Sequence, residues 1–90
     1  MTAYIRIIED ATACAHLFRL GRDIEAALNM VDLVDRAMPL VPTRPVEEQA
    51  MWTQVLTAML ECQERQDWLG VADWLEYEMV GLVRMALEPV

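Results

Sequence analysis

Lysine and serine are absent from this 90-residue sequence, and histidine occurs once, as His16. Without serine no Ser-His-Asp triad is available, and one histidine leaves acid–base chemistry with a single candidate. His16 falls on the polar side of its predicted helix near Glu9, where we interpret it as a solvated surface residue. All seven basic residues are arginine, a composition that suggests a GC-rich bacterial genome as the source.

Cysteine is almost as scarce. Cys14 and Cys62 are too few for a disulfide framework, and neither belongs to a CxxC or Cys/His cluster that could hold a metal. Each falls on the apolar face of its predicted helix, with no basic neighbour there to lower the pKa of the thiol. We therefore predict two structural cysteines, no metal site and a reducing, cytoplasmic location.

Positive charge and long apolar runs are also lacking. Fifteen acidic residues against seven arginines give a net charge of −8, which disfavours nucleic acids and anionic membranes as partners. The longest apolar stretches, residues 68–72 and 79–83, are too short to span a bilayer. Glu9 and Asp10 interrupt the region where a signal peptide needs apolar residues, so we expect neither export nor membrane insertion.

Cofactor motifs are missing as well. Gly21, Gly70 and Gly81 stand alone rather than in a phosphate-binding loop. Glu47 and Glu48 are adjacent, but they follow a proline at a helix start, where the helix dipole favours negative charge. We predict no catalytic residue, no cofactor and no enzymatic activity. A metal site built from carboxylates alone is the one enzymatic alternative.

Apolar residues are in excess, at 56% of the sequence. Typical globular proteins have about 45–50% even when glycine is counted. A chain of this size buries about two-thirds of its surface on folding, so its core is modest. The surplus indicates that a partner protein or a second copy covers part of the apolar surface.

Three breaks divide the sequence into helices. Gly21 suits a helix C-cap, the prolines within residues 39–45 cannot continue an α-helix, and Asp67 can cap the N-terminus of the last helix. No segment alternates with the period of a strand. The predicted helices cover about residues 3–20, 24–38, 45–65 and 68–87.

The first three helices each have an apolar face with helical spacing. In the first helix the predicted core residues are Tyr4, Ile7, Ile8, Ala11, Cys14, Ala15 and Phe18. In the second they are Ile24, Ala27, Val31, Val34 and Met38, with Met30, Leu33 and Ala37 beside them. In the third they are Met51, Trp52, Val55, Leu56, Met59 and Cys62.

The last helix has two apolar faces. The predicted core face consists of Trp68, Val71, Ala72, Leu75, Met79, Leu82, Val83 and Ala86. The second face consists of Gly70, Trp74, Tyr77, Gly81 and Met85. Aromatic residues and methionine are enriched at interface cores, so we predict that this second face binds a partner. Packing against another helix of the same chain is the alternative.

Residues 17–28 (LFRLGRDIEAAL) resemble the junction between the two helices of a tetratricopeptide repeat, with its turn glycine and following alanine. The resemblance implies a helical hairpin. It departs from the family at the second junction, which has Gln66 at the glycine position and does not follow the 34-residue spacing. Residues 67–79 (DWLGVADWLEYEM) resemble a stretch in small bacterial all-helical proteins, and this likeness implies no activity.

We therefore predict one all-α domain over residues 1–90. Two αα-hairpins, about 3–38 and 45–87, are joined by the Pro-rich linker 39–45 and form a four-helix bundle or a short tetratricopeptide-like stack. The predicted function is that of an adaptor or export-chaperone-like module that binds another protein through the last helix, as a homodimer. The alternative is an immunity or antitoxin-type inhibitor that neutralises a basic toxin or enzyme. Its acidic contact residues are Glu25, Asp32, Asp35, Glu61, Glu64, Asp73 and Glu76.

Overall fold

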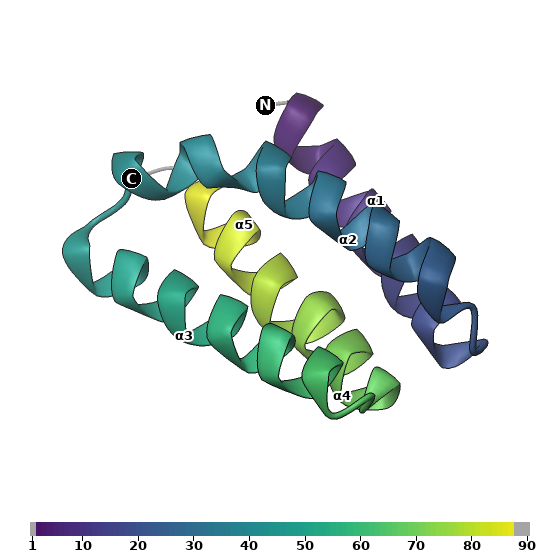
Figure 1. Cartoon of the computed structure of the whole chain (residues 1–90). Coiled ribbons are helices and arrows are strands. Elements are labelled where there is room, and N and C mark those ends of the chain that lie inside the picture. The colour runs from purple at the N-terminus through teal and green to yellow at the C-terminus, as the bar shows by residue number, and fades with distance from the viewer. Residues whose placement is uncertain (1, 88–90) are drawn as a thin grey trace.

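The computed structural model describes residues 2–87, and every regular element in that range is a helix. The first hairpin pairs α1 (Thr2–Arg19) with α2 (Asp23–Ala37), and the 3₁₀-helix η1 (Met38–Thr43) leads to α3 (Val46–Glu64) (Figure 1). The last helix is continuous and comprises α4 (Trp68–Asp73), the π-helical segment η2 (Trp74–Met79) and α5 (Val80–Leu87). The predicted all-α class is confirmed, and each helix boundary lies within one residue of its prediction.

The two hairpin turns are built alike. Gly21 takes the left-handed conformation with φ 79°, and Gln66 takes it in the second turn with φ 58°. In the first turn the Arg22 amide donates to the Leu17 carbonyl at 3.0 Å. In the second turn the Asp67 amide donates to the Cys62 carbonyl in the same way, at 2.8 Å. Both turns therefore end their helices with the same left-handed cap, although one of them has no glycine.

The linker is more ordered than its prolines suggest. Residues 38–43 form a 3₁₀-helix with Leu40 buried, so the Pro-rich linker has regular structure although the α-helix ends before it. Pro39 stands at the start of this helix, where the missing N–H has no helical partner to lose. Arg44 then donates to both carboxylate oxygens of Glu48, at 2.7 and 3.1 Å, which fixes the first turn of α3. This hydrogen bonding holds the pKa of Glu48 below its usual value.

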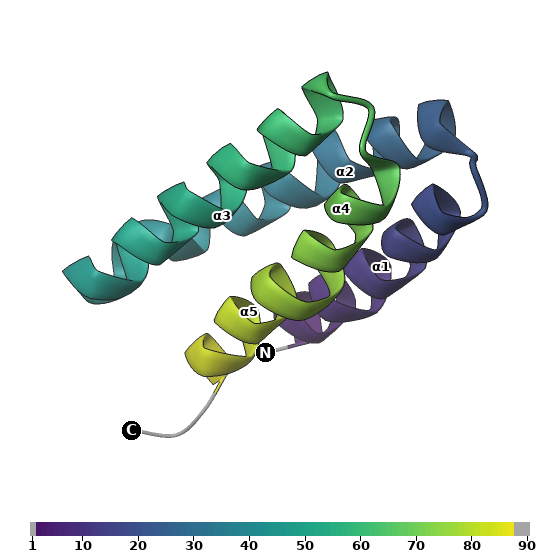
Figure 2. The ribbon, with the colours of Figure 1, turned by 90° about the horizontal axis from the view of Figure 1, so that it is seen from below.

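The bundle is closed on three sides and open on the fourth. α1 packs against the last helix along its length, α2 packs on α1, and α3 packs on α4 and η2. α2 and α3 scarcely approach each other, although both border the same side of the bundle. Figures 1 and 2 show this arrangement from two directions. The side between α2 and α3 is therefore covered only by side chains.

Two contacts fasten α1 to the last helix near the hairpin turns. Phe18 stacks on Trp68 with ring centroids 5.8 Å apart. Arg19 pairs with Asp73 at 3.0 Å and also donates to Glu76. These hydrogen bonds raise the pKa of Arg19. These two contacts add an aromatic pair and an ion pair to the packing of the first hairpin on the second.

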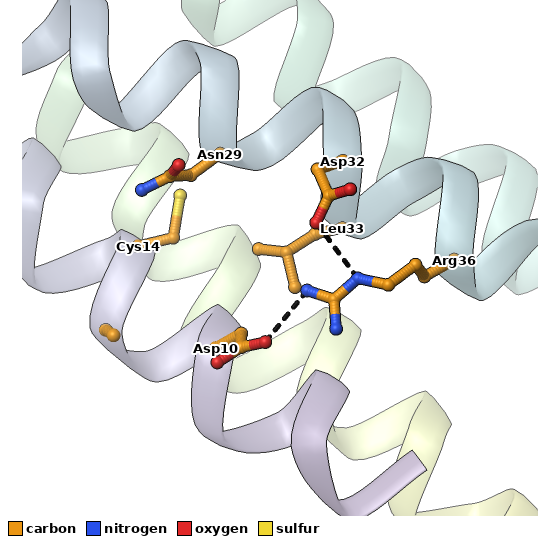
Figure 3. A pocket seen from close by; sticks show the side chains of 7 residues that line it. Asp10, Cys14, Asn29, Asp32, Leu33 and Arg36 are labelled. Carbon is orange, nitrogen blue, oxygen red and sulfur yellow. Dashed lines mark hydrogen bonds and ion pairs between the residues drawn. The ribbon is translucent and has the colours of Figure 1, made fainter. Parts of the chain in front are cut away.

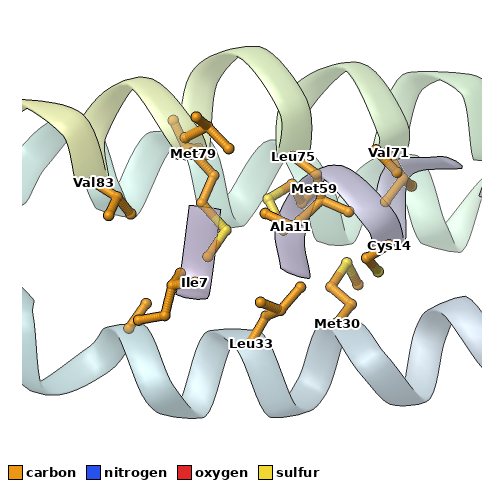
Figure 4. Packing of buried hydrophobic residues seen from close by; sticks show 14 of the residues in the cluster. Ile7, Ala11, Cys14, Met30, Leu33, Met59, Val71, Leu75, Met79 and Val83 are labelled. Carbon is orange, nitrogen blue, oxygen red and sulfur yellow. The ribbon is translucent and has the colours of Figure 1, made fainter. Parts of the chain in front are cut away.

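Most of the predicted core is confirmed. The seven apolar residues assigned to the first helix are buried or half-buried, as are the eight on the core face of the last helix. In α3 the prediction fails at Met51, which is 43% exposed. Figure 4 shows Met30 and Leu33 pointing from α2 into the cluster that also contains Met59 and Leu75.

The predicted core face of α2 is wrong at two of its five residues, Ile24 and Val31. Ile24 and Val31 are 77% and 59% exposed, whereas the buried residues form a neighbouring row. This row consists of Ala26, Met30, Leu33 and Ala37. The physical reason is close approach of the helices, because alanines line α2 where it meets small residues of α1. The Cys14 thiol reaches the Ala26 carbonyl at 3.2 Å, a distance that a larger residue between the helices would prevent.

Candidate protein-binding surface

The five residues predicted to bind a partner do not share one open face. Gly70 lies in a tight place, because a Cβ built on it would stand 2.4 Å from Asp67 Oδ2 and 3.0 Å from Cys62 Sγ. The Asp67 carboxylate caps α4 by accepting from the Gly70 amide at 3.0 Å. Gly70 therefore serves the packing of the second hairpin, in agreement with the alternative of an internal contact.

Trp74 and Tyr77 do come together at the surface. With Asp73 and Glu78 they line a shallow hollow on the last helix. Tyr77 is exposed, but Trp74 is half-buried and packs against the core. This hollow presents one exposed aromatic ring beside two acidic residues, which is a small apolar target for a partner.

Gly81 and Met85 lie further along the last helix. A Cβ on Gly81 would meet nothing within 4 Å, so this glycine is not explained by close packing. Met85 is half-buried against the core. The π-helical segment explains why the five residues separate, because its wider turns shift side chains away from the positions that α-helical spacing gives them.

The larger apolar surface lies on the open side of the bundle. A groove between α2 and α3 has Met30 and Met59 as its floor and Val34, Leu56 and Leu60 as its walls. Both methionines are buried, the valine and Leu56 are half-buried, and Leu60 is 58% exposed. The lining is almost purely apolar. We call these five residues the α2–α3 groove.

The groove continues onto the outer surface of α2. Ile24, Leu28 and Val31 follow one another at helical spacing and are all more than half exposed. Ala27 and Val34, between this row and the buried row, are half-buried and apolar. We call Ile24, Leu28 and Val31 the outer row of α2. Groove and outer row together form one apolar surface that crosses half the circumference of the helix.

The size of the groove decides what it can hold. Its volume is about 130 Å³. Small-molecule sites usually measure about 300–1,000 Å³, so a whole cofactor or drug-sized ligand does not fit. One or two apolar side chains of another helix do fit. Methionine floors suit such a use, since their flexible thioethers adapt to differently shaped guests.

A second, polar hollow lies between α1 and α2 (Figure 3). Its side chains come from Asp10, Ala13, Cys14, Asn29, Asp32, Leu33 and Arg36. The Arg36 guanidinium joins the two helices, with Nη2 at 2.9 Å from Asp10 and Nε at 3.0 Å from Asp32. Both carboxylates of the hollow are thus paired with a guanidinium. This arrangement stabilises the hairpin and leaves no unpaired carboxylate among the lining residues to act as a base.

The cysteines are buried on separate helices and both are free. Burial raises the pKa of the Cys14 thiol to about 11, so it is protonated at neutral pH and weakly nucleophilic. Cys62 has a basic neighbour that the sequence analysis missed, because Arg65 Nη2 lies 3.5 Å from its Sγ. Arg65 caps the end of α3 and folds back onto the preceding turn. Within residues 2–87, neither thiol hydrogen-bonds to a histidine or a carboxylate that could act as its base.

The acidic residues of the alternative inhibitor surface are largely paired within the chain. Arg19 engages Asp73 and Glu76, Arg22 engages Glu25 at 2.9 Å, and Arg36 engages Asp32. Within residues 2–87, three members of the predicted set take part in no ion pair, namely Asp35, Glu61 and Glu64.

Three further findings bear on the site. Among residues 2–87, no group of three or more His, Cys, Asp or Glu residues is placed to hold a metal ion. In the same range no helix combines the length and apolar character that crossing a membrane requires. No family model, curated protein or solved structure matches the chain.

Proposed function

We propose that this protein is a non-enzymatic interaction module that binds a helix of a partner protein in the α2–α3 groove. The observation that supports this proposal is the open side of the bundle, where an apolar groove continues into the exposed outer row of α2. A helix laid between α2 and α3 completes the fourth side of the bundle and covers the groove, whose border adjoins the outer row of α2. This is the helix-in-groove mode of recognition, which reads apolar side chains at helical spacing.

This location differs from the last helix predicted from the sequence. The Trp74–Tyr77 hollow offers one exposed ring, whereas the groove and outer row offer a continuous apolar surface from two helices. Monomeric proteins rarely expose large contiguous apolar patches unless these bind something. An adaptor or chaperone-like role and a homodimer through the last helix remain predictions.

The inhibitor alternative receives less support from the charges. Four of its seven acidic residues are already paired with arginines of the same chain. Exposed pairs of this kind are weak, but a basic partner would have to displace the arginines before it gained their carboxylates. The three unpaired acidic residues belong to α2 and α3, the two helices that form the groove.

The test is selection from a displayed library of amphipathic helices whose flanking positions are free to vary. Peptides recovered by the wild-type protein are then measured against two matched variants, Leu60→Gln in the groove and Leu69→Gln on α4. Both leucines are about equally exposed, at 58% and 62%, so their loss affects folding alike. We expect Leu60→Gln to weaken binding about tenfold, since burial of one leucine side chain stabilises a complex by about 1.5 kcal/mol or more.

Two results contradict the proposal. One is that no helical peptide is recovered, which leaves the open side without a function in binding. The other is that Leu60→Gln and Leu69→Gln weaken binding equally, whereas Tyr77→Ala abolishes it. That outcome moves the site to the last helix, as the sequence predicts.

A further inference from the structure

We propose that the helix received by the α2–α3 groove is a basic amphipathic helix, with lysine or arginine bordering its apolar stripe. This inference rests on the proposed function, because it names the chemistry of the segment that the groove binds. It is carried by the carboxylates that border the groove, which form no ion pair within residues 2–87.

One end of the groove is strongly negative. Asp23 begins α2 and Glu64 ends α3, and the two helices run antiparallel, so both residues belong to the end at the hairpin turns (Figure 1). Glu61 also lies in the last turn of α3, which contains no basic residue. The C-terminus of a helix carries a partial negative charge of its own, about half an elementary charge. At the end of α3 the carboxylates and the helix dipole therefore add up, whereas Asp23 lies at the positive N-terminus of α2.

The nearby arginines form no direct pair with the carboxylates that border the groove at this end. Arg65 follows α3 directly, but its Nη2 turns back to the Cys62 sulfur. Arg22 precedes α2 and pairs with Glu25. Neither makes an ion pair with Asp23 or Glu64 within residues 2–87. A cation supplied by the guest helix gains the attraction of both carboxylates.

The outer row of α2 ends on a carboxylate as well. Asp35 follows Val31 at the next helical position of the same row, is exposed and makes no ion pair within residues 2–87. A guest that covers Val31 therefore meets Asp35 at its edge. A second copy of this chain is a poor occupant, because it adds a further net charge of −8.

The opposite end of the groove also carries a carboxylate, because Asp35 lies in the last turn of α2, next to η1. The row of α3 that supplies Leu56 and Leu60 continues toward η1 with Thr53 and Gln49. Gln49 donates to the Arg44 carbonyl at 2.8 Å, and the Arg44 guanidinium itself is occupied by Glu48. Carboxylates therefore border the groove at both ends, with Asp23 and Glu64 at one and Asp35 at the other, and basic residues along the guest helix face them.

The experiment uses three synthetic peptides of about 18 residues, or about 27 Å of helix. They share one leucine stripe and differ only in the residues that border it, which are lysine, glutamine or glutamate. Binding to the full chain is measured by fluorescence anisotropy at about 50 mM and about 300 mM salt. We expect the lysine peptide to bind about tenfold more tightly than the glutamine peptide at low salt, and the glutamate peptide to bind least. The difference should fall to about threefold at high salt.

Charge variants locate the effect. Glu64→Gln should reduce the advantage of the lysine peptide about threefold, because one carboxylate of the negative end is removed. Glu78→Gln, on the last helix beside Tyr77, serves as the matched control and should leave the advantage unchanged. Leu60→Gln should weaken all peptides, since they share the leucine stripe.

The outcomes separate this inference from the proposed function. Equal binding of the lysine and glutamine peptides, lost together in Leu60→Gln, overturns the basic guest but leaves the groove as a binding site. Lysine-peptide binding that survives Leu60→Gln is attraction to the acidic chain in general, and it too overturns the inference. If none of the three peptides binds, the proposed function fails as well.

Discussion

Trp52 of α3 is fully buried, yet its indole N–H has no hydrogen-bond acceptor within residues 2–87. Buried polar groups are usually satisfied, and an unpaired donor costs about 1–3 kcal/mol. Packing of the ring therefore stabilises the fold, whereas the unpaired N–H group destabilises it.

A substitution at Trp52 separates these two effects. Trp52→Phe removes the unpaired donor together with part of the ring, so we expect the free energy of unfolding to fall by no more than about 1 kcal/mol. Trp52→Ala should cost about 3–5 kcal/mol because it leaves a cavity. Urea denaturation of the three proteins measures both values. A loss in Trp52→Phe close to that in Trp52→Ala means that the nitrogen is satisfied.

The Cys14 thiol makes stability depend on pH in the alkaline range. Burial raises its pKa from 9.0 to about 11, so the unfolded chain releases this proton at lower pH than the folded one. The stability that this group contributes is fully present below pH 9 and is lost as the pH rises toward 11. We expect wild-type protein to lose roughly 2 kcal/mol more than Cys14→Ala over this interval. Parallel changes in stability for the two proteins across these pH values would refute the shift.

At the scale of the element, two helical glycines should respond to alanine in opposite directions. Gly70→Ala places a methyl group against Asp67, whose carboxylate caps α4, so we expect a loss of about 1–2 kcal/mol. Gly81→Ala meets open space inside a helix and should gain about 0.5–1 kcal/mol. Thermal melts of both variants test this pair, and a gain at position 70 or a loss at position 81 contradicts it.

The elements were largely predictable because their ends carry local signals. Gly21 and Asp67 mark turns through backbone freedom and capping, which depend on a few neighbouring residues. The core row of α2 was not predictable in the same way. Its apolar residues exceed what one face can bury, and the choice of row depends on how closely α1 approaches. That approach is set by alanines facing Cys14, a contact between elements that spacing within α2 does not reveal.

The last helix shows another limit of reasoning from spacing. Its predicted core residues are buried or half-buried before, within and after the π-helical segment, including Leu75 and Met79 inside it. The prediction of the second face assumes uniform α-helical turns, and these end at Trp74, where the π-helical segment begins. Gly70 and Tyr77 are therefore placed in different surroundings although α-helical spacing unites them.

For the whole molecule, the sequence indicates a surplus of apolar surface but not its place. The α2–α3 groove consists of Met30, Val34, Leu56, Met59 and Leu60, from helices that are separate along the chain. In the sequence all of these residues except Leu60 are assigned to the core or lie beside it, because the open side exists only in the folded bundle. The one available signal was the breadth of apolar residues on α2, since the outer row adds Leu28 to the predicted Ile24 and Val31.

Solution mass tests the predicted homodimer and where it would form. If the outer row of α2 mediates self-association, net repulsion between acidic chains should oppose it, and added salt should favour it by screening. We expect light scattering to show a monomer at low ionic strength, with a larger average mass at high salt and high concentration. A dimer that is stable at low salt and disrupted by Tyr77→Asp but not by Leu28→Asp instead supports the last helix as the interface.

The lack of close contact between α2 and α3 also has a consequence for local unfolding. α2 packs mainly on α1, so it can detach while α1, α3 and the last helix keep their mutual contacts. Amide hydrogens of α2 should then exchange with deuterium through a partial opening that costs less than global unfolding. A guest in the groove slows this exchange specifically, because it binds only while α2 is in place. Binding would thus convert the element that opens most readily into a part of the cooperative unit.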